Sequence, residues 1–149
     1  MTSRKSAQKS KTTWKHLLVL LGILALGTLV RLYKLDTPLA DWHSWRQADT
    51  VSVSREYVKH GYPLLEPHFH DLSNIPSGEE NLNGYRMVEF PFINYAVAMV
   101  VKSFNLNVMA DIVVVSRLFS IAASLITAIS LYSIVNILSK RKSLALIAS

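Results

Sequence analysis

The chain of 149 residues contains no cysteine, which excludes a disulfide framework and a metal site with cysteine ligands. Its first 35 positions contain no acidic residue, and the stretches 17–30 and 118–139 contain no charged residue at all. Such long apolar runs exclude an intrinsically disordered chain. They also argue against a simple soluble domain, because 118–139 is long enough to cross a bilayer as a helix.

Positive charge exceeds negative charge by six, but the basic residues do not form one patch. One cluster precedes the first apolar run, and a second, Lys140–Lys142, follows the second run. The first cluster consists of Arg4, Lys5, Lys9, Lys11 and Lys15. A nucleic-acid-binding domain gathers its positive charge on one face, so this separation predicts no nucleic-acid partner. Basic clusters flanking apolar runs indicate the cytoplasmic side of a membrane.

The charge pattern therefore predicts an all-α integral membrane protein, multi-pass in the cell membrane, with a cytoplasmic N-terminus. The expected segments are a basic tail (1–15), a transmembrane helix (16–35), an external loop (36–111), a second transmembrane helix (112–139), a cytoplasmic turn (140–142) and the start of a truncated third span (143–149). A signal peptide is the alternative for the first run, but no small-residue cleavage site follows Val30. The short final run suggests an N-terminal fragment of a larger membrane protein.

Two helices are expected in the external loop. The first covers about 45–60, because Ser44 and Gln47 have capping-box spacing and a Gly-Tyr-Pro turn follows at 61–63. The second covers about 91–104 and is too short to span a membrane, so it is expected to lie in the outer interface. The face predicted to contact lipid consists of Ile93, Val97, Val100, Val101 and Phe104.

Polar chemistry concentrates at the start of the first external helix. Asp41 and His43 immediately precede it, and Arg46 and Arg55 lie on it. A helix N-terminus attracts phosphate, and a carboxylate can act as a base toward an acceptor hydroxyl. The combination suits group transfer from a phosphate-linked lipid. In the alternative interpretation, Asp41 is a turn residue and Arg46 forms a surface pair with Asp49, three residues along.

The segment 66–71 contains two histidines and two acids, which are metal-ligand types. His68 and His70 occupy alternate positions and would need an extended strand to share a metal, and no second ligand group is evident. We therefore expect an exposed polar loop with no metal site. On the first external helix, Glu56 and His60 are four residues apart and are expected to pair.

Several motifs occur in an order that resembles the N-terminal part of GT-C fold integral-membrane glycosyltransferases. These families include the protein O-mannosyltransferases, the lipid A aminoarabinose transferases and enzymes like those of families 39 and 83. The motifs are Arg31–Asp36 at the end of the first span, Asp41–Thr50, Val53–Tyr57, the proline-bearing Val88–Tyr95, Ser116–Ser120 opening the second span, and Lys140–Lys142 closing it. The resemblance covers almost the whole chain.

The resemblance implies site residues in this loop. It assigns the catalytic role to Asp41, with Asp49 as the alternative, because many relatives carry Asp-Glu where Trp42 follows the aspartate here. His43, Arg46, Arg55 and Glu89 are implied substrate-binding residues. No cofactor is implied with certainty, and a divalent metal is left open.

The implied reaction transfers a sugar from a polyprenyl-phosphate-linked donor to a lipid, glycan or protein acceptor on the non-cytoplasmic face, with inversion at the anomeric carbon. Membrane lipids are the remaining expected partner. The 149 residues alone are expected to be inactive, because the resemblance places further contacts in later loops. The rival interpretation is a non-enzymatic small membrane protein or a transporter fragment whose outer loop only binds.

Overall fold

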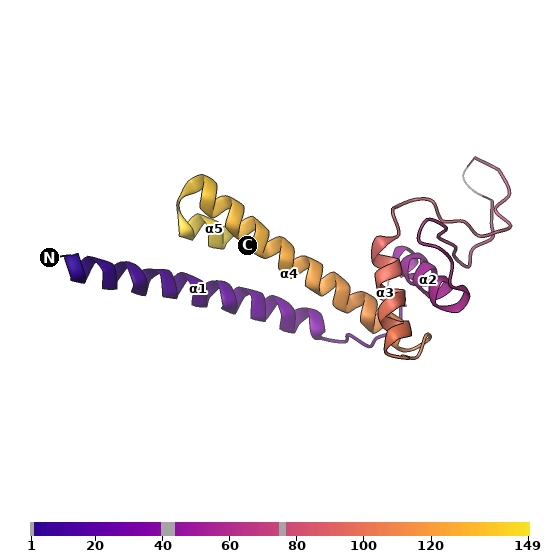
Figure 1. The fold of residues 1–149 in the computed structure, drawn as a ribbon, viewed down its shortest axis with the longest axis horizontal. Helices are drawn as coiled ribbons and strands as arrows, with labels where there is room; N and C mark the ends of the chain where they lie inside the picture. Colours follow the sequence, from indigo (N-terminus) through magenta and orange to yellow (C-terminus); the bar gives the residue numbers. More distant parts are fainter. Residues whose placement is uncertain (1, 40–43, 75–76) are drawn as a thin grey trace. The chain divides into compact units, whose positions relative to one another are not determined.

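The computed structural model describes residues 2–39, 44–74 and 77–149, which form five α-helices and no strand. The helices are α1 (Thr2–Leu32), α2 (Ser44–His60), α3 (Phe92–Ser103), α4 (Asp111–Ser139) and α5 (Lys142–Ala148), labelled in Figure 1. Chain contacts divide the protein into two compact units. The apolar unit contains Met1–Lys34 and Ser120–Ser149, and the polar unit contains Leu35–Phe119, so that α4 contributes to both.

Within the described residues, two helices are long and apolar enough to cross a membrane: Trp14–Leu32 of α1 and the whole of α4. Their side chains are mostly exposed, with only 6% and 17% of the most apolar stretch of each helix buried. This pattern differs from the core helix of a soluble protein and favours membrane association. The first helix extends further toward the N-terminus than the expected span, and it ends at Leu32 rather than at residue 35.

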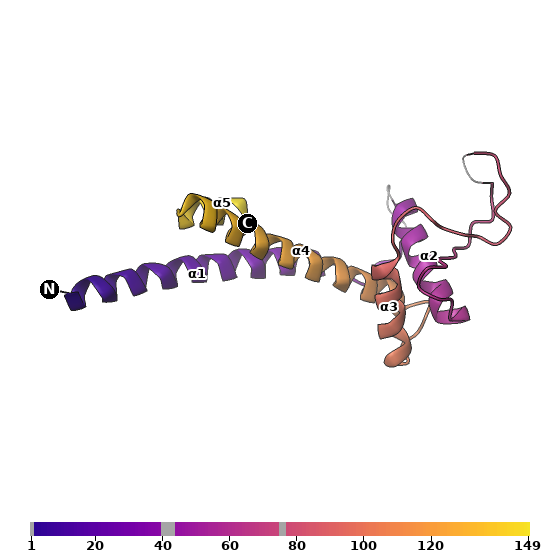
Figure 2. The same ribbon diagram turned by 45° about the horizontal axis from the view of Figure 1, so that its top comes forward.

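A short helix folds back from the end of α4 in the apolar unit. Lys140 adopts a left-handed conformation (φ 54°) and Arg141 an extended one, which ends α4 and begins α5 (Figure 2). Helix α5 contacts α1, and Ala145 is fully buried. The residues expected to begin a third span are therefore helical and packed within this unit.

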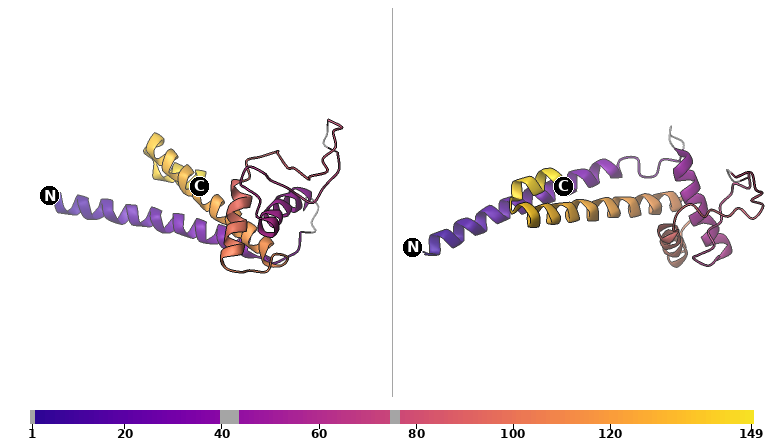
Figure 3. Two further views of the ribbon diagram at one scale, coloured as in Figure 1. Left: turned by 45° about the vertical axis from the view of Figure 1, so that its right-hand side comes forward. Right: turned by 90° about the horizontal axis from the view of Figure 1, so that it is seen from above.

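The core of the polar unit lies where α2 packs against α3 (Figure 3). Val51 of α2 contacts Val97 and Val101 of α3, and the first turns of α4 add Ile112 and Val115. A second cluster lies beside it and contains Val53, Tyr57 and Ala98. Burial of these side chains supplies the main driving force for docking the two helices.

The prediction of which face of α3 contacts lipid is partly wrong. Val97 and Val101 are each only 1% exposed and lie in the core, whereas Ile93 and Phe104 are exposed as expected. Phe92 and Met99 complete the exposed side with Ile93. The helix is apolar on nearly every side, so periodicity alone does not show which face packs against the protein.

The long segment between α2 and α3 is held together by backbone hydrogen bonds between residues 67–69 and residues 84–86. The Phe69 N–H donates to the Gly84 carbonyl at 2.8 Å, and the Arg86 N–H donates to the Pro67 carbonyl at 2.8 Å. Gly84 has a φ of +64°, and a Cβ there would lie 2.6 Å from the Phe69 carbonyl oxygen, so this turn requires glycine. The pairing returns residues 85–91 along α2.

The expectation of a wholly exposed polar loop at 66–71 is wrong for His68. Its ring is 8% exposed and stacks on Tyr62 at a centroid distance of 3.9 Å, with Tyr85 on its other side at 4.4 Å. The ring Nδ1 also lies 2.7 Å from the Asn83 carbonyl oxygen. Both aromatic neighbours lie outside the segment 66–71, so the residues of that segment alone did not indicate that His68 is buried.

Candidate functional site

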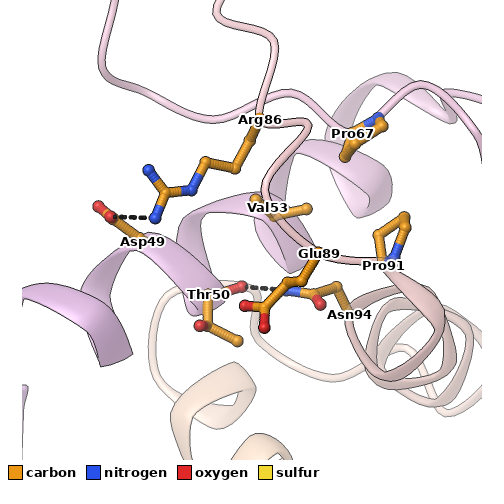
Figure 4. A pocket seen from close by; sticks show the side chains of 8 residues that line it. All are labelled: Asp49, Thr50, Val53, Pro67, Arg86, Glu89, Pro91 and Asn94. Carbon is orange, nitrogen blue, oxygen red and sulfur yellow. Dashed lines mark hydrogen bonds and ion pairs between the residues drawn. The ribbon is translucent and has the colours of Figure 1, made fainter. Parts of the chain in front are cut away.

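A small polar pocket lies where α2, α3 and the returning segment meet (Figure 4). Asp49 and Thr50 come from α2, Asn94 comes from α3, and Arg86 and Glu89 come from the segment before α3. The remaining lining residues are Val53, Pro67 and Pro91. The pocket has room for about one water molecule, which is enough for one reacting atom but not for a sugar ring.

Two ion pairs connect α2 to the returning segment beside this pocket. Asp49 Oδ2 lies 2.9 Å from Arg86 Nη2, and Arg46 Nη2 lies 3.2 Å from Glu89 Oε2. The expected intrahelical pair between Arg46 and Asp49 is therefore replaced by two tertiary pairs. An exposed pair within one helix contributes only about 0.2–0.5 kcal/mol, so partners brought in by the loop displace it easily.

The helices are also joined by a buried polar contact at the pocket wall. Asn94 Nδ2 donates to the Thr50 carbonyl oxygen at 2.7 Å, and Asn94 is 7% exposed. Buried side-chain amides need partners, so this hydrogen bond fixes the rotation of α3 against α2. It thereby sets the place where Glu89, just before α3, meets α2.

Sequence reasoning missed Arg86, Thr50 and Asn94. A specific hydrogen bond of Asn94 was predictable, because Asn94 is a lone amide within an apolar helix and buried amides usually make specific contacts. The ion pair of Arg86 was not predictable, since its partner Asp49 is far away in the chain and only the loop path brings them together.

Of the predicted site residues, Asp49 and Glu89 line the pocket, and Arg46 does not line it but pairs with Glu89. Arg55 does not line it and instead has its Nη2 3.3 Å from His70 Nε2. Asp41 and His43 lie outside the described residues. The predicted pair between Glu56 and His60 is confirmed at 3.2 Å.

Three groups in the described part of the polar unit have shifted pKa values. Burial, helped by Tyr95, raises the pKa of Tyr57 to about 12, so its hydroxyl stays protonated and donates to the Leu64 carbonyl at 2.7 Å. Hydrogen bonding by Ser73 lowers the pKa of Asp71. Burial, with Arg55 second, lowers the pKa of His70, which keeps its imidazole neutral near pH 7.

No group of three or more His, Cys, Asp or Glu side chains within residues 2–39, 44–74 and 77–149 is arranged to hold a metal ion. Comparison with protein-family models, with curated proteins and with solved structures finds no match to this chain.

Proposed function

We propose that this chain contributes the outer-face site of a membrane glycosyltransferase that uses a polyprenyl-phosphate-linked sugar. The observation that supports the proposal best is the pocket, which is lined by two carboxylates, Asp49 and Glu89, and by Arg86, with Arg46 paired to Glu89. The segment that carries them joins helices suited to crossing a membrane. A lipid-linked donor would reach such a site from the adjoining bilayer.

In the proposed reaction, a carboxylate accepts the proton of an acceptor hydroxyl as its oxygen attacks the anomeric carbon. The bond from that carbon to the phosphate oxygen breaks, and the lipid phosphate leaves with the electron pair. Arginine pairs well with phosphate oxygens, and in this proposal the exposed Arg46 receives them. Attack opposite the leaving phosphate inverts the anomeric carbon.

We assign the base to Asp49, because its carboxylate lines the pocket and Arg86 holds it in position. Asp41 is the competing assignment and His43 a further substrate-binding candidate, both from the resemblance. Glu89 faces the acceptor side of the pocket in this proposal. Arg55 lies beside His70 and not in the pocket, so it would bind a donor that extends from the pocket to His70.

The test uses membranes from cells that express the full reading frame, with radiolabelled polyprenyl-phosphate sugars as donors. Asp49→Asn should lower transfer by about 10²–10⁴-fold, the usual range for loss of a general base. Asp71→Asn is the matched control, because Asp71 is an exposed loop aspartate that accepts a hydrogen bond from Ser73 and does not line the pocket. Equal loss in both variants would contradict the assignment.

Two further variants separate the alternatives. Arg86→Gln removes the ion pair but leaves the Asp49 carboxylate, so it should retain more transfer than Asp49→Asn. If Asp41→Asn abolishes transfer while Asp49→Asn stays near wild type, the base is Asp41. Membranes that bind the donor but transfer no sugar would support the rival class, a binding protein.

The proposal includes a topology in which the N-terminus and the 140–142 turn are cytoplasmic and the polar unit is outside. Since the chain has no cysteine, single introduced cysteines report their own side of the membrane. A membrane-impermeant maleimide should label Glu80→Cys on intact cells and Ser10→Cys only after permeabilisation. The reverse pattern would overturn the topology.

A further inference from the structure

A second cluster of reactive groups lies on α2, apart from the pocket. Ser52 and Glu56 are four residues apart and so share one face of the helix. His70, from the following loop, lies between them: its Nδ1 contacts the Ser52 Oγ, and its Nε2 lies 3.0 Å from Glu56 Oε1. The order hydroxyl, imidazole, carboxylate is that of an activated serine nucleophile.

The hydrogen-bond donors and acceptors determine which nitrogen of His70 carries the proton. A carboxylate only accepts and a guanidinium only donates, so Glu56 Oε1 and Arg55 Nη2 make opposite demands on Nε2. The contact with Glu56 is the shorter, at 3.0 Å against 3.3 Å, and we infer from it that Nε2 carries the hydrogen. In the neutral ring, Nδ1 is then the acceptor, and Ser52 Oγ–H is its donor. The backbone N–H of His70 donates to the same Ser52 oxygen at 2.9 Å, which fixes the hydroxyl against the ring.

Neighbouring groups hold both ends of this arrangement. The second oxygen of Glu56 lies 3.2 Å from His60 Nε2, so the carboxylate is held from two sides, and its side chain is only 12% exposed. His70 is held by its loop, in which Phe69 pairs with Gly84. Ser52 is half-buried, whereas the His70 side chain is 42% exposed, so the cluster is open to a substrate from solution.

We propose that Ser52 is a nucleophile for carboxylic esters, with His70 as its base and Glu56 as the group that orients the imidazole. The Ser52 oxygen attacks the ester carbonyl carbon as its proton passes to His70 Nδ1. The bond to the alcohol oxygen then breaks, and the alcohol leaves with that proton. Water then gives a proton to His70 Nδ1 as its oxygen attacks the acyl carbon. The bond from that carbon to the Ser52 oxygen breaks, the carboxylic acid leaves, and the proton on His70 restores the Ser52 hydroxyl.

The charges around His70 are compatible with this role. Burial lowers its pKa most, Arg55, Lys59 and His60 lower it further, and Glu56 raises it. The net lowering keeps the imidazole neutral, which is the form that accepts a proton from serine, at and somewhat below neutral pH.

The test treats the detergent-purified chain with a fluorophosphonate probe, in which serine attack at phosphorus expels fluoride. Peptide mass spectrometry should find the adduct on Ser52. Ser52→Ala should abolish labelling, and His70→Gln should slow it by roughly 10²–10⁴-fold. Ser54→Ala is the matched control, because Ser54 is 1% exposed and bonds to the Thr50 carbonyl oxygen, so labelling should persist.

Glu56→Gln distinguishes a catalytic cluster from a clamp that merely holds the loop. In a catalytic cluster the variant should slow labelling while the adduct stays on Ser52. Absence of an adduct on Ser52, or an unchanged labelling rate in His70→Gln, would overturn the proposal. These measurements involve no sugar transfer, so they do not depend on the proposed glycosyltransferase activity.

Two substrates then distinguish a water-soluble ester from a lipid ester as the substrate of Ser52. A water-soluble ester, p-nitrophenyl acetate, should show a burst of one nitrophenolate per chain that Ser52→Ala removes. Phosphatidylcholine vesicles should release fatty acid only if the cluster accepts lipid esters. Adduct formation without turnover of either ester would overturn the hydrolytic half of the proposal.

Discussion

Helix α4 carries one residue type into two different surroundings. Ile112, in its part of the polar unit, is 1% exposed and packs against α2 and α3, whereas Ile137, in its part of the apolar unit, is 71% exposed. Other side chains of the protein bury Ile112. Isoleucine at position 137 has no such partner, and a bilayer is the solvent in which an exposed apolar side chain costs little.

The two units also differ in how polar groups are used. The polar unit is connected across its helices by the Asp49–Arg86 pair and the bond from Asn94 to Thr50. In the apolar unit, hydroxyls such as Thr28 and Ser133 bond to the carbonyl one turn earlier in their own helix, as Ser54 also does in the polar unit. Satisfying polar groups within one helix suits a segment surrounded by lipid, whereas bonds across helices position a site.

The largest difference between the units is expected in the free energy of unfolding when isoleucine is replaced by alanine once in each unit. Ile112→Ala should lower the free energy of unfolding of the polar unit by about 2–5 kcal/mol, since it leaves a cavity in the core. Ile137→Ala should change it little. Hydrogen exchange of the α2 amides in detergent measures both, and equal protection in the two variants would contradict the contrast.

A smaller effect is expected at the loop turn. Gly84→Ala should destabilise the loop by about 1–2 kcal/mol from its left-handed backbone, with an added cost because the new Cβ meets the Phe69 carbonyl. Gly78→Ala is the control, because Gly78 also has positive φ but nothing within 4 Å of its Cβ position. Thermal unfolding should show the larger shift for Gly84→Ala.

The smallest effect is the pH dependence of the contact between His70 and α2. Burial lowers the pKa of folded His70 below the usual histidine value of about 6.5, so the undocked state binds more protons as the pH falls. The free energy that neutral His70 contributes to docking is complete above about pH 6.5 and is lost as the pH falls toward the folded pKa. Exchange of the His70 amide, corrected for intrinsic rate, should accelerate at pH 5.5, and Arg86 exchange should change less.

Much of the helical framework was predictable from local patterns. The turn at 61–63 and the start near Ser44 predicted α2 to within one residue, and the uncharged run predicted the course of α4. The site was less predictable. The resemblance implied Arg46, Asp49 and Glu89 as site residues, but their ion-pair partners across the polar unit were not predicted, because pairing depends on the path of a long loop and its glycine turn.

The sequence alone determined where the chain is helical and which helices can cross a membrane, because these properties depend on neighbouring residues and on the length of uncharged runs. Tertiary structure decided which face of α3 is buried, which carboxylate meets which arginine, and that His70 reaches Ser52 and Glu56. Such contacts join residues far apart in the chain, and their geometry follows from helix docking and loop pairing rather than from any local pattern.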